Sequence, residues 1–446
     1  MSKTSFVPPS ATLAVNERLR RLIDAGEPIL HLAFGEAGLP VPEEVVDALT
    51  RGAPDNAYGP VAGSASARAA AAAWFGRRRL PTDPDQVVIA PGSKALLWGL
   101  LAVLPGDVVL PRPSWVSYAA QAALAGKRVW GVPIAGDGPG GVPDPAALEE
   151  TLAEAARQGH RPGVIVVTLP DNPTGTVPSP DDVRRTVEIA EEHGLSIVSD
   201  EIYRDLAHDP AGLHSPAEYL PERTYVTGGL SKNMALGGWR IGFVRVPEGS
   251  AGGATREALL GLASEVWSSA PAPMQHVVAH VLNEPPAVVA HIDRSRRLHR
   301  AATLAAHSRL VDAGVHCRPP TGGFYLYPDF EPLRPELGAR GVDGGDALAT
   351  HLLERFGIGV LSGVAFGDEP AALRCRIATS LLYGQTDDER RQALATADPA
   401  ELPWIKGSLD RLGEAVASIR TTPGGTRDRA TLRARCGRSA LRELRG

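Results

Sequence analysis

The sequence predicts an α/β fold: a mostly parallel, seven-stranded sheet between helices, followed by a smaller α+β domain. Short apolar runs alternate with helical patterns through the first two thirds of the chain, which is typical of a parallel sheet covered on both faces. After about residue 285 the pattern changes to a long helical stretch and scattered short strands. A chain of 446 residues is long enough for two such domains.

The main sheet is predicted from seven apolar runs. They cover residues 87–90, 108–111, 128–133, 164–169, 195–199, 224–227 and 240–246. Helical patterns separate or follow them at 94–104, 145–157, 180–193 and 258–267. Sheets of this kind bind ligands at the carboxyl ends of their strands. We therefore look for functional residues just after these runs.

The remaining segments define the predicted domain boundaries. Residues 286–420 are expected to form the smaller domain, with helices at 291–313, 345–356 and 409–419 and strands at 322–327, near 358–361 and near 373–378. Residues 41–285 are the large domain, and residues 1–40 are expected to pack with the small one. Residues 421–446 hold seven arginines and few apolar residues, which predicts a disordered basic tail. A basic arm for an acidic partner is the less favoured interpretation.

Composition excludes several classes of function. The formal net charge of −5 has the wrong sign for a nucleic-acid-binding protein. No stretch reaches the length of a membrane span, and residues 1–9 lack the apolar core of a signal peptide. Cys317, Cys375 and Cys436 form neither a metal-ligand spacing nor a disulfide framework. The sequence therefore predicts a cytoplasmic protein without a metal site.

The lysine at position 232 indicates a chemical role that an arginine could not perform. Of 46 basic residues only five are lysines, so arginine is the usual choice where a positive charge suffices. An amine can lose its proton and form an imine, which a guanidinium does not do. Lys232 lies between a strand-like run and a Gly-rich turn that begins at Gly237. Lys232 is therefore a candidate Schiff-base residue, and a solvated surface lysine is the alternative.

Polar residues suited to a pyridine ring follow two of the predicted strands. Asp200 comes directly after the strand 195–199, where a carboxylate can pair with a pyridinium. Tyr203, three residues later, can hydrogen-bond a ring hydroxyl. Asn172, in Asn-Pro-Thr-Gly after the strand 164–169, can donate to the same oxygen. Taken singly, Asn-Pro-Thr-Gly is a turn signal and Asp200 a possible helix cap.

An anion site is predicted where the strand 87–90 leads into a helix. Gly92, Ser93 and Lys94 open that helix, and free backbone amides with the helix dipole attract phosphate there. Arg240, eight residues after Lys232, is a second phosphate ligand, since a guanidinium binds phosphate with two hydrogen bonds.

Two further candidates serve stacking and carboxylate binding. Trp115 follows the strand 108–111, where an indole can stack on a cofactor ring or simply pack in the core. Arg374, on a predicted strand of the small domain, is a natural clamp for a substrate carboxylate. Arg376 shares its face of the strand, so the pattern alone does not decide between them.

Together, these residues stand in an order and spacing that resemble the class I/II aminotransferases. These are fold type I enzymes dependent on pyridoxal 5′-phosphate (PLP), and the resemblance to their aspartate and aromatic subgroup covers about residues 25–420. The residues that carry it are Gly92, Ser93, Lys94, Trp115, Asn172, Asp200, Tyr203, Ser231, Lys232, Arg240 and Arg374.

The resemblance implies a role for each residue. Lys232 would form the internal aldimine with PLP and move the proton, and Asp200 would pair with the pyridine nitrogen. The ring and its hydroxyl would be held by Trp115, Asn172 and Tyr203. The phosphate would be bound by Gly92, Ser93, the Lys94 backbone, Ser231, Arg240 and, from the partner subunit of a homodimer, Tyr58. The substrate would be bound by Gly35, Lys94, Trp115, Asn172 and Arg374.

The chain departs from the family pattern in two places. Gly229 stands where many members have a phosphate-binding serine, and Gly228 stands where the subgroup usually has asparagine. Arg374-Cys375-Arg376-Ile377 replaces a more apolar stretch.

The resemblance implies transfer of an amino group between an amino acid and a 2-oxo acid. Lys94 falls where some aspartate-type members bind a distal carboxylate, which favours glutamate or aspartate as donor. Trp267 is a further candidate for the pocket wall. The alternative is a PLP-dependent lyase, decarboxylase, cyclase or oxidase on the same fold. A transcriptional regulator is disfavoured, because only about 25 residues precede the matching region.

Overall fold

The large part of the chain is built on one seven-stranded sheet. The computed structural model describes residues 8–420. The strands run in the order β2-β8-β7-β6-β5-β3-β4. Their bounds are β2 Val87–Ala90, β3 Asp107–Arg112, β4 Val129–Pro133, β5 Pro162–Thr168, β6 Ser196–Asp200, β7 Thr224–Gly229 and β8 Gly242–Arg245. Only β8 is antiparallel to its neighbours β2 and β7, so the expected mostly parallel sheet is confirmed.

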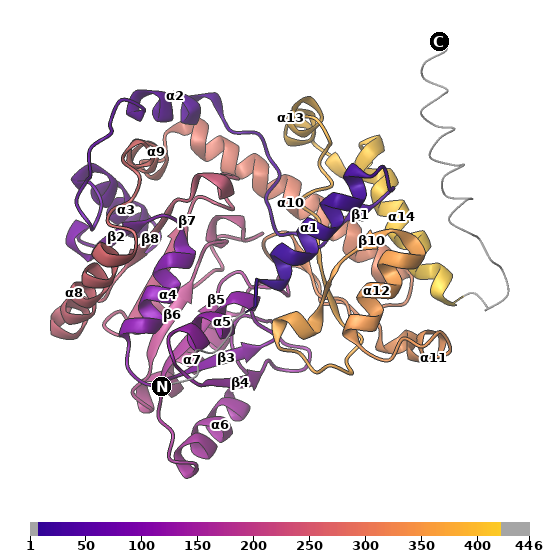
Figure 1. The fold of residues 1–446 in the computed structure, drawn as a ribbon, viewed down its shortest axis with the longest axis horizontal. Helices are drawn as coiled ribbons and strands as arrows, with labels where there is room; N and C mark the ends of the chain where they lie inside the picture. Colours follow the sequence, from indigo (N-terminus) through magenta and orange to yellow (C-terminus); the bar gives the residue numbers. More distant parts are fainter. Residues whose placement is uncertain (1–7, 421–446) are drawn as a thin grey trace.

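Both faces of the sheet are covered by helices (Figure 1). The side chains of β5 show how this is encoded: Val164 and Val166 join the apolar cluster on one face, and Ile165 and Val167 join the cluster on the other. Such two-sided burial explains the continuous β-branched runs of the sequence. The first face packs against α4 Ser93–Val103, α5 Val116–Leu124 and α8 Gly249–Val266. The second packs against α2 Glu43–Gly52, α3 Ala65–Arg77, α6 Pro145–Arg157, α7 Pro180–Glu192 and α9 Ala272–Leu282.

The C-terminal part has its own apolar core and small sheets. Strand β12 Cys375–Ala378 lies between β11 Leu361–Ser362 and β9 Tyr325–Leu326. The N-terminal strand β1 Leu30–His31 pairs with β10 Ile358–Gly359. The helices here are α10 Pro286–Asp312, α11 Arg334–Gly338, α12 Gly345–Phe356, α13 Asp387–Ala395 and α14 Pro403–Arg420. In Figure 1 the indigo helix α1 Ala11–Asp24 lies beside these orange and yellow elements. Domain boundaries near residues 40 and 285 stay a prediction.

Several predicted elements were wrong in extent. Strand β8 begins at Gly242, because Arg240 has a left-handed backbone, with φ +57°. The predicted strand 322–327 is reduced to Tyr325–Leu326, and the one near 358–361 is split into β10 and β11. Helix α8 begins at Gly249, nine residues before the predicted start at 258. Helices α2, α3, α5, α9 and α13 were not predicted. The predicted tail lies outside the described residues.

The parallel strands end at one edge of the sheet, and this edge carries the site. The segments that leave β2, β3, β5, β6 and β7 at their carboxyl ends contain most of the candidate residues. Edges of this kind bind ligands in open α/β sheets. Among residues 8–420, no helix is both long and apolar enough to cross a membrane.

Candidate active site

Lys232 lies on the loop that leaves β7, with its amine directed at the N-terminal segment. Its Nζ donates a hydrogen bond to the carbonyl oxygen of Gly35 over 2.6 Å and lies 5.7 Å from the centre of the Tyr203 ring. Burial, reinforced by the nearby Arg376 guanidinium, lowers the pKa of Lys232 to about 8. An amine with this pKa is partly neutral near pH 7.5, which a nucleophile requires.

Asp200 ends strand β6 and is buried. Tyr118 Oη donates to Asp200 Oδ2 over 2.8 Å, and Thr227 Oγ1 donates to Oδ1 over 3.2 Å. Burial raises the pKa of Asp200 to about 6. Burial makes this carboxylate costly to ionise. A cationic ligand, such as a protonated pyridine nitrogen, would therefore stabilise its charged form strongly. Tyr118, on α5, was missed by the sequence reasoning.

The loop after β5 is locked by its own hydrogen bonds. Thr174 donates to Asp171 Oδ2 through both its backbone nitrogen, over 3.1 Å, and its hydroxyl, over 2.6 Å. A Cβ at Gly175 would lie 2.0 Å from the carbonyl oxygen of Tyr325, so only glycine fits this close approach. The loop thereby fixes Asn172, whose Oδ1 accepts from Arg376 Nη1 over 3.3 Å. Its NH2 group is left to donate.

Tyr325 joins Tyr203 in the middle of the site. The phenol oxygens of the two buried rings are 2.7 Å apart. Tyr325 also meets the N-terminal loop, since a Cβ at Gly35 would lie 2.0 Å from its hydroxyl oxygen. Sequence reasoning placed 322–327 on a strand but assigned Tyr325 no role. An aromatic residue directly after Gly322-Gly323-Phe324 was the available signal.

The start of α4 forms a cradle that fits a phosphate. Gly92 is the N-cap with φ +93°, and a Cβ there would lie 2.2 Å from Nη2 of Arg240. A Cβ at Gly242 would lie 2.2 Å from the Ser93 nitrogen. Two glycines therefore let a guanidinium and a free helix N-terminus approach one point. Both groups favour an anion.

Lys94 and Trp115 lie together next to this cradle. Lys94 Nζ is 5.1 Å from the centre of the Trp115 ring, and Trp115 packs edge-on against Tyr118. Burial, with Arg240 as a second cause, lowers the pKa of Lys94. The Trp115 indole therefore lies between the Lys94 amine and Tyr118, the residue that donates to Asp200.

Arg376 lies on β12 and Arg374 directly precedes that strand, and the two arginines have different surroundings. Arg374 Nε donates to Asp329 Oδ2 over 2.7 Å, and Nη1 donates to both oxygens of Asp368. Two carboxylates therefore already occupy its guanidinium. Arg376 is almost fully buried and donates to Asn172 and to the carbonyl oxygen of Ala33.

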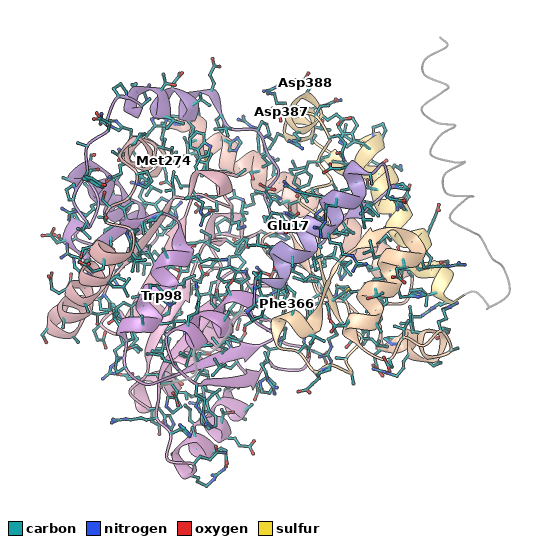
Figure 2. The ribbon with its side chains drawn as sticks, viewed as in Figure 1. Glu17, Trp98, Met274, Phe366, Asp387 and Asp388 are labelled. Atoms are coloured by element: carbon teal, nitrogen blue, oxygen red, sulfur yellow. The ribbon has the colours of Figure 1, made fainter. Side chains whose placement is uncertain are left out.

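Arg376 also has room for a further acceptor. Its Nε has no hydrogen-bond partner among residues 8–420, and a buried unpaired donor is costly unless a ligand satisfies it. The guanidinium carbon lies 4.8 Å from the centre of the Tyr325 ring and 5.1 Å from that of Phe366. Phe366, near the middle of the molecule in Figure 2, accepts a hydrogen bond from the Ser114 nitrogen.

The structure does not bring every predicted residue into this group. Tyr58 is 91% exposed and, within residues 8–420, makes no hydrogen bond to the other site residues. Ser231 precedes Lys232 on the same loop, but we find no side-chain hydrogen bond for it within residues 8–420. Trp267 packs against the apolar cluster of α4 and α8. Residues 8–420 contain no group of three or more His, Cys, Asp or Glu that could hold a metal ion.

Comparison with known proteins gives consistent matches. Residues 27–382 match the family model described as aminotransferase class I and II. The chain is 30% identical over 404 residues to an aspartate aminotransferase of Geobacillus stearothermophilus, which covers 87% of this chain and 96% of that protein. It is also 30% identical over 396 residues to an aspartate/prephenate aminotransferase of Thermus thermophilus, which covers 86% of this chain and 94% of that protein.

A solved structure extends this similarity to the fold. The aspartate aminotransferase of Thermus thermophilus, solved with maleate, superposes with a TM-score of 0.75 at 30% sequence identity. The match covers 87% of this chain and 96% of that one.

Proposed function

Since this chain belongs to the class I and II aminotransferases, we propose that it moves the amino group of glutamate or aspartate to a 2-oxo acid with PLP as cofactor. Its activity is that of a PLP-dependent aminotransferase, which the family match and the named relatives support. The choice of glutamate or aspartate as the amino-group donor is the more specific part of the proposal. It rests on Lys94, whose amine lies beside Trp115, and on relatives named for aspartate. A lyase or decarboxylase on this fold is not favoured.

The residues of the site fit PLP part by part. The phosphate would be held by Gly92, Ser93, the Lys94 backbone, Ser231 and Arg240, and by Tyr58 of a second copy. The ring would lie against Trp115, with Asp200 at its nitrogen and Asn172 and Tyr203 at its hydroxyl. Lys232 would hold the cofactor covalently. When bound, PLP withdraws electrons from the substrate Cα and so acidifies its proton.

The chain's own residues then perform the remaining work. Arg376, rather than Arg374, binds the substrate carboxylate with its guanidinium. The amine of Lys232 removes the proton from Cα as a general base, for which a pKa of about 8 is well matched. Asp200, fixed by Tyr118 and Thr227, keeps a positive charge at the facing nitrogen. Burial of these groups excludes water and strengthens their interactions.

One observation carries the proposal. The amine of Lys232 lies among groups from three distant segments: the Gly35 carbonyl, Asp200 with the Tyr203 ring, and Arg376. A surface lysine, which was the alternative interpretation, would have a solvated amine. A homodimer and a cytoplasmic location, both expected from the sequence, belong to the same proposal.

The test is an absorption spectrum of the purified protein with PLP, followed through a panel of L-amino acids. A visible band that glutamate or aspartate shifts into the near-ultraviolet, with release of the matching 2-oxo acid, supports the proposal. A band that shifts only with other amino acids rejects the acidic donor but keeps the activity. If no band forms, the assignment of Lys232 is wrong.

A further inference from the structure

The two cations of the proposed site take acceptors from one short segment. The carbonyl oxygen of Ala33 accepts from Arg376 Nη2, and that of Gly35 accepts from Lys232 Nζ over 2.6 Å. Residues 33–35 lie between strand β1 and helix α2 and have no regular secondary structure. The backbone just before this segment is held by two strands, since the Leu32 N–H donates to the Gly359 carbonyl and the Ala378 N–H donates to the Leu32 carbonyl, both over 2.8 Å.

The imidazole of His31 adds a side-chain contact to the next residue along the chain, Ala33. Its Nε2 lies 2.9 Å from Asn16 Oδ1, and its Nδ1 accepts from the backbone nitrogen of Ala33 over 3.4 Å. Asn16 Oδ1 can only accept and the Ala33 N–H can only donate. Both contacts therefore require the same neutral ring, with its proton on Nε2.

Charges around the ring keep it in this form. Burial is the main cause that lowers the pKa of His31 to about 4, and Arg20 on α1 and Arg376 on β12 act in the same direction. At neutral pH the Nδ1 lone pair is thus available to the Ala33 N–H. A protonated ring would present N–H groups at both nitrogens and lose this contact.

Helix α1 holds the segment from its other side. Asn16 is 8% exposed, and Arg20, one turn later on the same face, forms an ion pair of 3.7 Å with Glu36. The Arg20–Glu36 pair is solvent-exposed and contributes little. The buried Asn16–His31 contact is therefore the one that orients the ring.

We propose that His31, held by Asn16, is a positioning residue that fixes the backbone of Ala33 and thereby the guanidinium of Arg376. The proposal rests on the proposed function, in which Arg376 binds the substrate carboxylate. The N–H of Ala33, in the peptide that joins residues 32 and 33, donates to His31, and its carbonyl oxygen, in the peptide that joins residues 33 and 34, accepts from Arg376. The imidazole therefore limits rotation of the backbone at Ala33, and without it the carbonyl oxygen of Ala33 can shift together with the guanidinium bound to it.

This arrangement predicts which kinetic constant changes. Every amino acid carries the α-carboxylate. Displacement of Arg376 therefore weakens the binding of all accepted amino acids by a similar factor. Loss of binding that is equal in ground state and transition state raises KM and leaves kcat unchanged. General loss of folding would instead lower the amount of active enzyme without changing KM.

The experiment compares four single variants and one double variant, all full-length and PLP-loaded, with the wild type. His31→Phe removes both ring contacts, and His31→Asn keeps an acceptor at the position of Nδ1. Arg20→Ala, which removes the exposed ion pair but neither contact of the ring, is the matched control. We expect KM to rise about five- to thirtyfold in His31→Phe for each accepted amino acid. His31→Asn should recover part of this, and Arg20→Ala should stay near the wild type.

The fourth variant, Asn16→Asp, gives the proposal a pH signature. A carboxylate facing Nε2 raises the pKa of His31, so the ring gains its second proton at Nδ1 as the pH falls. The ratio of the variant's KM to the wild type's should then rise between pH 8 and pH 6. In Asn16→Asp combined with His31→Phe this ratio should be independent of pH.

The outcomes separate this inference from the proposed function. A wild type that transaminates no amino acid overturns the function itself. An active wild type whose His31→Phe variant keeps its KM overturns the role of His31. So does an Asn16→Asp variant whose KM ratio is flat with pH.

Discussion

The hydroxyl groups of Tyr203 and Tyr325 form a hydrogen bond of 2.7 Å between residues 122 positions apart. Burial raises the pKa of both phenols, so both are protonated at neutral pH. Two protons are then shared by two oxygens, and only one is needed for the bond between them. The other is free to be donated to a ligand, which suits the ring oxygen of PLP.

The first prediction concerns this pair. Tyr325→Phe leaves the Tyr203 hydroxyl without its protein partner and frees it to turn away from the ligand. We expect kcat/KM to fall about five- to tenfold, because one hydrogen bond of about 1 kcal/mol is lost. Tyr327→Phe, which removes a hydroxyl bonded to Asp368, is the control and should change activity less. Equal effects in steady-state assays of both variants would contradict the special role of the pair.

The second prediction separates Arg376, on β12, from Arg374, which directly precedes this strand. Arg376→Lys keeps the charge but loses the planar donor set that meets Asn172 and Ala33. We expect kcat/KM to fall about a hundredfold, since truncating a buried charged contact costs about 2–5 kcal/mol. Arg374→Lys, which disturbs only the ion pairs with Asp329 and Asp368, should cost less than about fivefold. The reverse ranking would restore Arg374 as the carboxylate ligand.

The third prediction tests Lys232. Lys232→Ala removes both the covalent attachment point and the base, so turnover should fall by more than about a thousandfold. The visible absorption of covalently held PLP should also be absent. Lys406→Ala, an exposed lysine paired with Glu401, should retain full activity and the band. Residual transamination by Lys232→Ala within tenfold of the wild type would rule out its assignment.

The fourth prediction concerns the cofactor-free protein. Burial raises the pKa of Asp200 from 3.8 to about 6, so between these values the folded state binds more protons than the unfolded state. Stability is then lost as the pH rises through this interval and stays lost above it. Asp200→Asn should therefore stabilise the cofactor-free protein at pH 8 by on the order of 1–3 kcal/mol, although it removes the activity.

Urea unfolding of the cofactor-free protein at pH 8 and pH 4 measures this effect. The gain of Asp200→Asn should shrink toward pH 4, where the native carboxyl is already protonated. Asp388→Asn is the control: its side chain is 94% exposed on α13 (Figure 2), and its change should stay within about 0.5 kcal/mol. A destabilised Asp200→Asn variant at pH 8 would contradict the burial argument.

The sheet was easier to predict from the sequence than the helices around it. Strands such as β5 are runs of β-branched residues, which both faces of the sheet bury, so the pattern is local. Helix α3 was missed because its 13 residues include seven alanines, which give no polar face to mark a helical stripe. Helix α13 was missed because its first six residues are all polar and only Ala393 is buried.

In the site, Asp200 and Asn172 could be predicted because polar residues that follow a buried strand are recognisable in the sequence. The choice between Arg374 and Arg376 could not be, because both lie on one face of the predicted strand. What separates them is the position of Asp329 and Asp368, which come from other segments. Tyr118 and Tyr325 were missed for the same reason, since their roles follow from contacts made across the fold.

The contact between Arg376 and Ala33 joins residues separated by 343 positions. A ribosome must therefore synthesise most of the chain before this part of the site can close, and contacts of such large sequence separation form late in folding. A nascent chain that ends before β12 has the phosphate cradle and Lys232 but lacks the last strand. Full affinity for an amino acid substrate would then report that synthesis and folding of the whole polypeptide are complete.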